Sequence, residues 1–175
     1  MNTKRLFYSV CVFLLVSTRV VGQNSGPEEV VRAFYKHDAK ASQVFSRRNL
    51  DSRKRWISTR LYNLFRKELN KQDALLKQHP DEKPFFGDGF PFRPIDERCD
   101  VNGKSYKRRY SVQAAKNHRG PHVNVIVHFS YPRPCTVAPL MYTARVIRSG
   151  AKWVIDDIVF DDGNTLSGVM KNNQY

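Results

Sequence analysis

The sequence predicts an α+β domain, with helices in the first half of the chain, an antiparallel sheet in the second half and a short helix at the end. Between residues 27 and 69, apolar side chains repeat at helical spacing, whereas from Lys107 onward they alternate with polar ones. Helices and strands in separate parts of a chain are typical of the α+β class. We expect one domain over residues 27–171, a length that suits a single core, with flexible tails at 23–26 and 172–175.

The first 22 residues have the layout of a secretory signal peptide. Lys4 and Arg5 precede an apolar run over Leu6–Val16, and Val20 and Gly22 occupy the cleavage positions. This run is shorter than the ~20 residues that span a bilayer, so no transmembrane span is expected after cleavage; a retained anchor is the alternative. The chain has no Asn-x-Ser/Thr sequon, which favours a bacterial protein that is periplasmic or secreted.

Two cysteines, Cys99 and Cys135, remain after the predicted cleavage. An even pair in an oxidising compartment favours a disulfide; the alternative is two buried thiols. Cleavage also lowers the formal net charge from +14 to +11 by removing three basic residues, so the exported chain stays basic.

Two helices are predicted before the strands. The first covers Pro27–Lys40, with proline and two glutamates in its first turn and a cluster of apolar residues on one face. The second is longer and carries an apolar stripe from Trp56 to Leu69; Asp51 or Ser52 is its expected N-cap.

Residues 79–96, the aromatic loop, combine four prolines with four phenylalanines. Proline at this density excludes a helix or a central strand. We expect an ordered connection whose phenylalanines pack on the core; an exposed surface for a ligand or partner is the alternative. The phenylalanines are Phe85, Phe86, Phe90 and Phe92.

Four segments in the second half predict antiparallel strands, because apolar and polar residues alternate along them. A two-residue turn at Ser149-Gly150 joins the last two. A short final helix is predicted over Thr165–Lys171. The strand segments are Ser111–Lys116, His122–Tyr131, Leu140–Arg148 and Lys152–Phe160.

Four aspartates cluster near the C-terminus of this basic chain. Alternation along the last strand predicts Asp156 and Asp157 on opposite faces, so they form no cooperating pair unless the strand bulges. Asp161 and Asp162 are expected near the positive end of the last helix, with Asn164 as its cap. The pattern thus assigns three of the four to the structure and leaves Asp156 or Asp157 as a pocket group.

Four segments, "VVRAFYK", "STRLYNLF", the "RSG" turn and "KWVIDDIVFDDGNTL", carry a resemblance over residues 27–171. They resemble a family of small exported bacterial proteins of unknown function in the nuclear-transport-factor-two-like superfamily, whose other members resemble ketosteroid isomerase and scytalone dehydratase. The resemblance implies a cone-like domain, in which helices pack on the concave face of a curved antiparallel sheet and a pocket lies at the open end. Superfamily members often pair through their sheets, so a homodimer is a candidate assembly.

The isomerase-like members use an aspartate base and a tyrosine donor within an apolar cavity. The resemblance therefore implies Asp156 or Asp157, with Tyr142 or Tyr110, as candidate catalytic residues. It implies Tyr142, Trp153 and Asp157 as candidate ligand-pocket residues. An aspartate acts as a base only where its surroundings tune its pKa. The alternative is a structural aspartate that accepts hydrogen bonds from the backbone or from an arginine such as Arg145.

No metal and no cofactor are expected. His122 and His128 share a strand face but lie about 20 Å apart along it, and His118 adds no third ligand. The chain has neither a Gly-x-Ser-x-Gly nucleophile motif nor a glycine-rich phosphate loop.

Basic runs predict a basic face on the domain. Aromatic residues lie beside them, as in nucleic-acid-binding proteins, but an exported protein meets little nucleic acid. We therefore expect an acidic protein or envelope component as the partner; solubility alone is the plainer alternative. The predicted face comprises Arg47, Arg48, Arg53, Lys54, Arg55, Lys107, Arg108 and Arg109.

Because no catalytic motif is assembled in the sequence, we expect an exported, non-catalytic binding or interaction module of the cell envelope. Its pocket would take a small apolar ligand, or its basic face an acidic partner. The alternative is a lyase or isomerase with a strand aspartate as general base.

Overall fold

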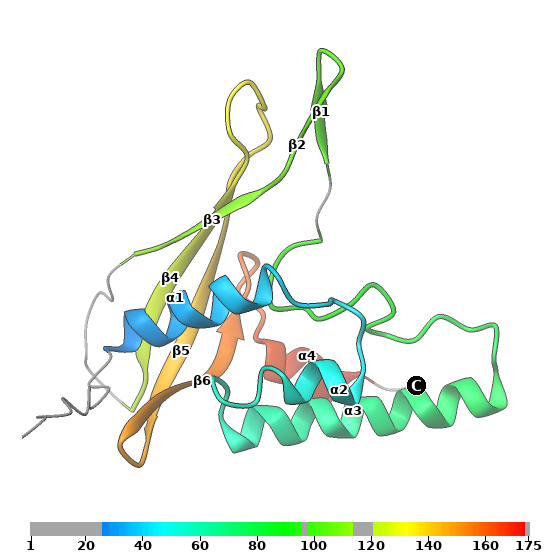
Figure 1. The fold of residues 1–175 in the computed structure, drawn as a ribbon. Helices are drawn as coiled ribbons and strands as arrows, with labels where there is room; N and C mark the ends of the chain where they lie inside the picture. The colour runs from blue at the N-terminus through cyan, green and yellow to red at the C-terminus, as the bar shows by residue number, and fades with distance from the viewer. Residues whose placement is uncertain (1–25, 96–97, 114–120, 174–175) are drawn as a thin grey trace, which may run out of the picture.

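The computed structural model describes residues 26–95, 98–113 and 121–173 (Figure 1). The predicted signal peptide and residues 23–25 of the predicted tail lie outside this part. Three helices come first, six strands follow and a fourth helix ends the described chain, so the α+β prediction is confirmed. The helices are α1 (Pro27–Asp38), α2 (Arg47–Asp51), α3 (Thr59–Gln78) and α4 (Leu166–Asn172).

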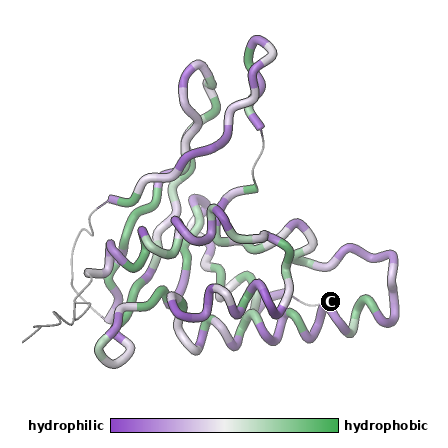
Figure 2. Tube along the Cα trace, in the orientation of Figure 1, coloured by the Kyte–Doolittle hydropathy of each residue, from purple (hydrophilic) through white to green (hydrophobic). Residues whose placement is uncertain are grey.

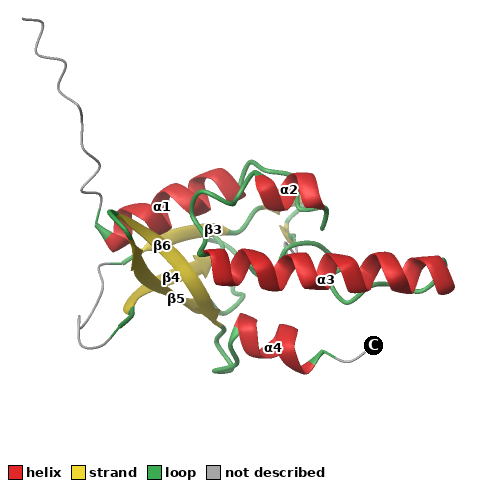
Figure 3. Ribbon diagram, turned by 90° about the horizontal axis from the view of Figure 1, so that it is seen from below, coloured by secondary structure: helices red, strands yellow, loops and turns green. Residues whose placement is uncertain are grey.

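Four strands form an antiparallel sheet in the order β3-β4-β5-β6. Alternate residues of β4 and β5 are buried, as the period of two predicts. Helix α1 lies across one face of this sheet, while α3 and α4 lie side by side near β6 (Figure 3). The strands are β3 (Arg109–Val112), β4 (Val123–Ser130), β5 (Leu140–Ser149) and β6 (Lys152–Val159). Most of the predicted strand at 111–116 lies outside the described residues.

Apolar residues concentrate in the sheet and in the segments packed on it, whereas α3 is largely hydrophilic along its length (Figure 2). Only four side chains of α3 are buried, those of Leu61, Phe65, Glu68 and Leu69. Within the part of the chain that the structure describes, no helix is both long enough and apolar enough to cross a membrane.

The second predicted helix is two helices in the structure, and the predicted caps are wrong. Ser46 caps α2 and Ser58 caps α3 through hydrogen bonds from backbone N–H groups. The segment between them consists of turns over residues 52–56 and a bridge from Ile57 to Ile155 of β6. At this bridge the Ser58 N–H donates to the Ile155 carbonyl (2.8 Å) and the Ile155 N–H donates to the Trp56 carbonyl (2.8 Å). Pairing with β6 thus overrides the helical pattern that includes Trp56.

The aromatic loop packs largely as predicted. Phe86, Phe90 and Phe92 are at most 7% exposed and pack edge to face or tilted against Phe65, whereas Phe85 is 43% exposed. The backbone of the loop closely approaches the connection between α1 and α2, since the Phe90 N–H donates to the Gln43 carbonyl (3.2 Å). Gly89 has a φ of +119°, and a Cβ there would lie 2.6 Å from the same carbonyl oxygen, so this approach requires glycine.

A second, two-stranded sheet was not predicted. Strands β1 (Cys99–Val101) and β2 (Lys104–Tyr106) form a hairpin around Asn102-Gly103, whose φ angles of 52° and 73° are both positive. Asn-Gly is the preferred pair for such a tight turn. The predicted disulfide is confirmed: Cys99 of β1 is bonded to Cys135 in the β4–β5 connection. The β1–β2 hairpin and the β4–β5 connection project from the body of the domain on the same side (Figure 1).

Candidate functional site

Strand β6 contains a bulge beside the two adjacent aspartates. Arg145 of β5 faces Asp157, while Val146 faces Ile155, so Asp156 is the extra residue. The bulge interrupts the alternation that placed the two acids on opposite faces, and both are buried, at 6% and 4% exposed.

Arg60 at the start of α3 reaches both acids. Its Nη2 lies 2.8 Å from Asp156 Oδ2 and 3.6 Å from Asp157 Oδ2. The arginine that pairs with the two acids is therefore Arg60, which the sequence analysis did not single out, and not Arg145.

Asp156 ties α3 to the sheet. The Ser58 hydroxyl donates to Asp156 Oδ1 (2.6 Å), and Arg60 donates to both carboxylate oxygens. Burial raises the pKa of Asp156, but the hydrogen bonds from Arg60 and Ser58 lower it by more, so the pKa lies below its usual value of 3.8.

Replacing Asp156 by asparagine should make the free energy of unfolding less dependent on pH between pH 3 and pH 7. A carboxyl group with a lowered folded-state pKa stabilises the protein above about pH 4 and loses that contribution as the pH falls through the folded-state pKa. We expect Asp156→Asn to reduce the free energy of unfolding by about 1–3 kcal/mol at pH 7, and by less at pH 3. Urea unfolding at the two pH values measures this, with the exposed Asp100→Asn as control. An equal loss at both pH values would argue against the assigned hydrogen bonds.

Asp157 holds the start of α4. Its Oδ1 accepts hydrogen bonds from the backbone N–H groups of Ile158 and Ser167 (3.0 Å each), and its Oδ2 accepts from the Ser167 hydroxyl (2.5 Å). The oxygens of both strand aspartates are thus occupied by donors, which fits a structural role better than proton abstraction.

Asp161 and Asp162, which follow β6, differ in their hydrogen bonding. Asp162 accepts from the backbone N–H and the side-chain amide of Asn164 (2.8 Å each). The cap of α4 is Thr165, whose hydroxyl accepts from the Gly168 N–H (3.0 Å), so the prediction of an Asn164 cap is wrong. Asp161 is exposed and has no hydrogen-bond or ion-pair partner among the described residues.

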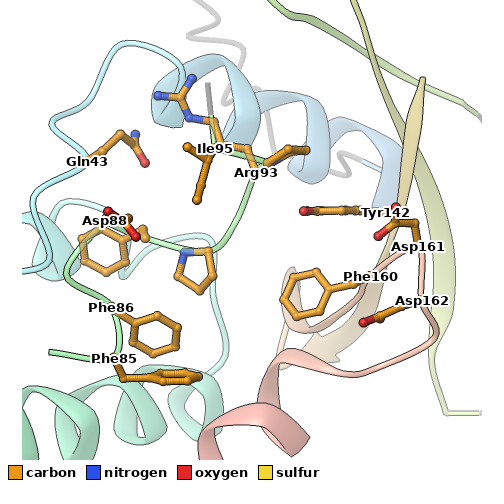
Figure 4. Close-up of a pocket in the computed structure, with 14 residues that line it drawn as sticks. Gln43, Phe85, Phe86, Asp88, Arg93, Ile95, Tyr142, Phe160, Asp161 and Asp162 are labelled. Carbon is orange, nitrogen blue, oxygen red and sulfur yellow. The ribbon is translucent and has the colours of Figure 1, made fainter. Parts of the chain in front are cut away.

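A pocket of about 540 Å³ lies between the aromatic loop and the end of β6 (Figure 4). Aromatic rings line both walls of the pocket. The charged residues belong to the aromatic loop and to the segment that follows β6. The rings are those of Phe85, Phe86, Phe90, Tyr142 and Phe160; the charged residues are Asp88, Arg93, Asp161 and Asp162.

Tyr142 is the polar group of the aromatic wall. The side chain is held edge to face between Phe129 and Phe160, with ring centroids 5.1 Å from each. The residue is 8% exposed, and its hydroxyl points into the pocket (Figure 4). Burial, with the nearby Asp161 carboxylate, raises the pKa of Tyr142 to about 12, so the hydroxyl keeps its proton at neutral pH.

Of the three pocket residues proposed from sequence, only Tyr142 lines this pocket. Trp153 lies under the guanidinium of Arg148, 4.5 Å from the ring centroid, and Asp157 bonds to α4. Phe160 and Asp161 were not predicted to line a pocket, and the aromatic loop was expected to pack on the core. The sequence feature that indicates this pocket wall is the aromatic loop, because its four phenylalanines are also consistent with a ligand surface.

The eight basic residues do not form one face. Arg53 is fully buried, with its Nε 2.7 Å from Asp38 Oδ1. The others fall into two groups. One lies on α2 and the turn after it, and the other runs from the end of β2 to the first residue of β3, in a different part of the molecule (Figure 1). Within the first group, Arg47 pairs with Asp73 (2.7 Å).

Metal-binding side chains are not gathered anywhere in the described ranges: no group of three or more His, Cys, Asp or Glu is placed to hold an ion. His122 Nε2 lies 3.7 Å from Asp156 Oδ2, and His118 is outside the described residues. Comparison with known proteins adds no assignment, since no family model, curated protein or solved structure matches the chain.

Proposed function

We propose that the protein is a non-catalytic binding module of the bacterial cell envelope, exported through its N-terminal segment, whose pocket takes a small, largely apolar ligand. The observation that carries this proposal is the aromatic pocket of about 540 Å³ with the Tyr142 hydroxyl pointing into it. Small-molecule sites typically measure about 300–1,000 Å³, with apolar walls and a few well-placed polar groups.

The exposure of apolar side chains in the pocket wall indicates that the pocket binds a ligand. Phe85 and Ile95, both lining the pocket, are 43% and 67% exposed, which is costly for large apolar side chains in water. A bound apolar molecule would cover them. We favour binding over proton abstraction because Asp156 and Asp157 already accept hydrogen bonds and do not line this pocket.

Membership of the nuclear-transport-factor-two-like superfamily is part of the same proposal. Helices before an antiparallel sheet, α1 packed on one face and a pocket near the end of β6 support it. The cone-like shape and pairing through the sheet belong to this proposal as well.

Binding of N-phenylnaphthylamine, an uncharged apolar fluorescent probe, tests the pocket. We expect Phe85→Ala and Ile95→Ser each to weaken binding about fivefold, because each removes part of an apolar contact. Met141→Ala is the matched control, since Met141 is 47% exposed but lies outside the pocket. All three variants should melt like the parent. Equal affinity in the four proteins, or no binding by the parent, would refute the proposal.

A further inference from the structure

We propose that the pocket selects ligands carrying a cationic amine, which lies between the Tyr142 hydroxyl and the Asp161 carboxylate, while the apolar body of the ligand contacts the aromatic rings. This inference rests on the proposed binding function and adds the chemical class of the ligand.

The Tyr142 hydroxyl is the first observation. Tyr142 is 8% exposed, yet its hydroxyl has no hydrogen-bond partner among the described residues and points into the pocket (Figure 4). The hydroxyl is thus available at the wall of the pocket, and a ligand with a polar group at this place can form a hydrogen bond to it. The hydroxyl keeps both a proton and its lone pairs at neutral pH, so it can accept a hydrogen bond from an ammonium group.

The charges around the pocket are the second observation. Asp88 is paired with Lys83, whose Nζ lies 2.6 Å from it, and Asp162 accepts from Asn164. Asp161 alone of the three carboxylates has no partner in the described structure. Asp161 and Asp162 raise the pKa of Tyr142 and Arg108 lowers it, so all three charges act on this side chain. Arg108 does not line the pocket and lies over the ring of Tyr131.

The arginine of the pocket does not balance Asp161. Arg93 Nε lies 3.5 Å from Asp38 Oδ2, and its guanidinium lies toward α1, away from Tyr142 and Asp161 (Figure 4). The pocket therefore offers a free negative charge, although the chain as a whole carries a formal charge of +14. An anionic ligand would meet this carboxylate, whereas a cation would be attracted to it.

The rings complete the site for a cation with an apolar body. Phe160 packs edge to face against Tyr142 and precedes Asp161 in the chain. A cation beside Asp161 is therefore close to aromatic surface, which attracts cations through the ring quadrupole. On the opposite wall, Phe85 and Phe86 provide contact for the apolar part (Figure 4).

Three compounds of similar size test the charge preference by displacing N-phenylnaphthylamine at pH 7: phenethylamine, 3-phenylpropan-1-ol and 3-phenylpropionate. We expect the ammonium compound to bind about fivefold more tightly than the alcohol, since Asp161 is exposed, and the carboxylate compound to bind most weakly. This preference should shrink as salt is added.

Two matched variants assign the preference to Asp161. Asp161→Asn should remove the advantage of phenethylamine over the alcohol, whereas Asp88→Asn, in the same pocket but already paired with Lys83, should keep it. Tyr142→Phe should weaken the binding of phenethylamine about threefold more than it weakens the binding of the probe. If the probe and the alcohol bind but phenethylamine binds no more tightly than the alcohol, the proposed preference for cations is wrong, whereas the proposed apolar binding pocket is retained. If no compound binds, both proposals fail.

Discussion

Replacing Arg53 by leucine is expected to reduce the free energy of unfolding by about 3–5 kcal/mol. Arg53 and Asp38 are both 0% exposed, and the Arg53 Nε lies 2.7 Å from Asp38 Oδ1. The remaining guanidinium nitrogens donate to the carbonyls of Asn49 (2.8 Å) and Ser42 (3.1 Å), and the group lies over the Phe90 ring. Removing the arginine leaves a buried carboxylate whose main partner is gone.

Arg55→Leu is the matched control, because Arg55 is exposed and its guanidinium stacks on the ring of Trp56. We expect it to change stability by less than about 1 kcal/mol. Combining Arg53→Leu with Asp38→Leu should recover part of the loss, since the unpaired charge is then absent. Urea unfolding of the four proteins measures these differences. A loss of less than about 1 kcal/mol in Arg53→Leu would contradict the buried pair.

Loss of the disulfide is the second large effect. The bond joins Cys99 to Cys135, 36 residues apart, and a closed loop of this length is expected to contribute about 4 kcal/mol. For a domain of this size that corresponds to a melting temperature about 8–16 °C lower in Cys99→Ser. The β1–β2 hairpin should be affected most, because strands of three residues are too short to be stable alone.

Calorimetry with and without reductant measures the contribution. Reductant should lower the melting temperature of the parent and leave that of Cys99→Ser unchanged, because the variant has no bond to break. Hydrogen exchange should show faster exchange in residues 99–106 of the variant, with β4 to β6 less affected. Equal melting temperatures of parent and variant would mean that the bond contributes nothing to stability.

Features set by neighbouring residues could be predicted from the sequence. Helix α1 was predicted to within two residues because proline, two glutamates and an apolar face mark it locally. The last two strands were predicted because their alternation is regular and the Gly150 turn joins them. The disulfide followed from there being only two cysteines beyond the predicted signal peptide.

Features set by distant contacts could not be predicted in the same way. Arg53 belongs to a basic run that resembles a solvated face, and only its contact with Asp38, 15 residues earlier, explains its burial. The bulge at Asp156 depends on pairing with β5, and its partner Arg60 lies 96 residues away. The hairpin at Asn102 is different, since its Asn-Gly turn was legible in the sequence and was overlooked.

The pocket is also a product of distant contacts. The aromatic loop forms one wall and Tyr142, Phe160 and Asp161 form the other, so neither segment alone indicates a cavity. Tyr142 was singled out because the resemblance implied a tyrosine in a pocket, but the aspartates proposed with it serve α3 and α4 instead.

Mapping amide and aromatic chemical-shift changes by NMR during titration with N-phenylnaphthylamine tests the ligand pocket most directly. We expect saturable changes in Tyr142, Phe160 and Asp161 and in residues 85–95 of the aromatic loop, which line the pocket. The exposed Val137, in the β4–β5 connection, should not respond. Shifts confined to other surfaces, or none at concentrations that saturate fluorescence, would contradict a binding site between the aromatic loop and β6.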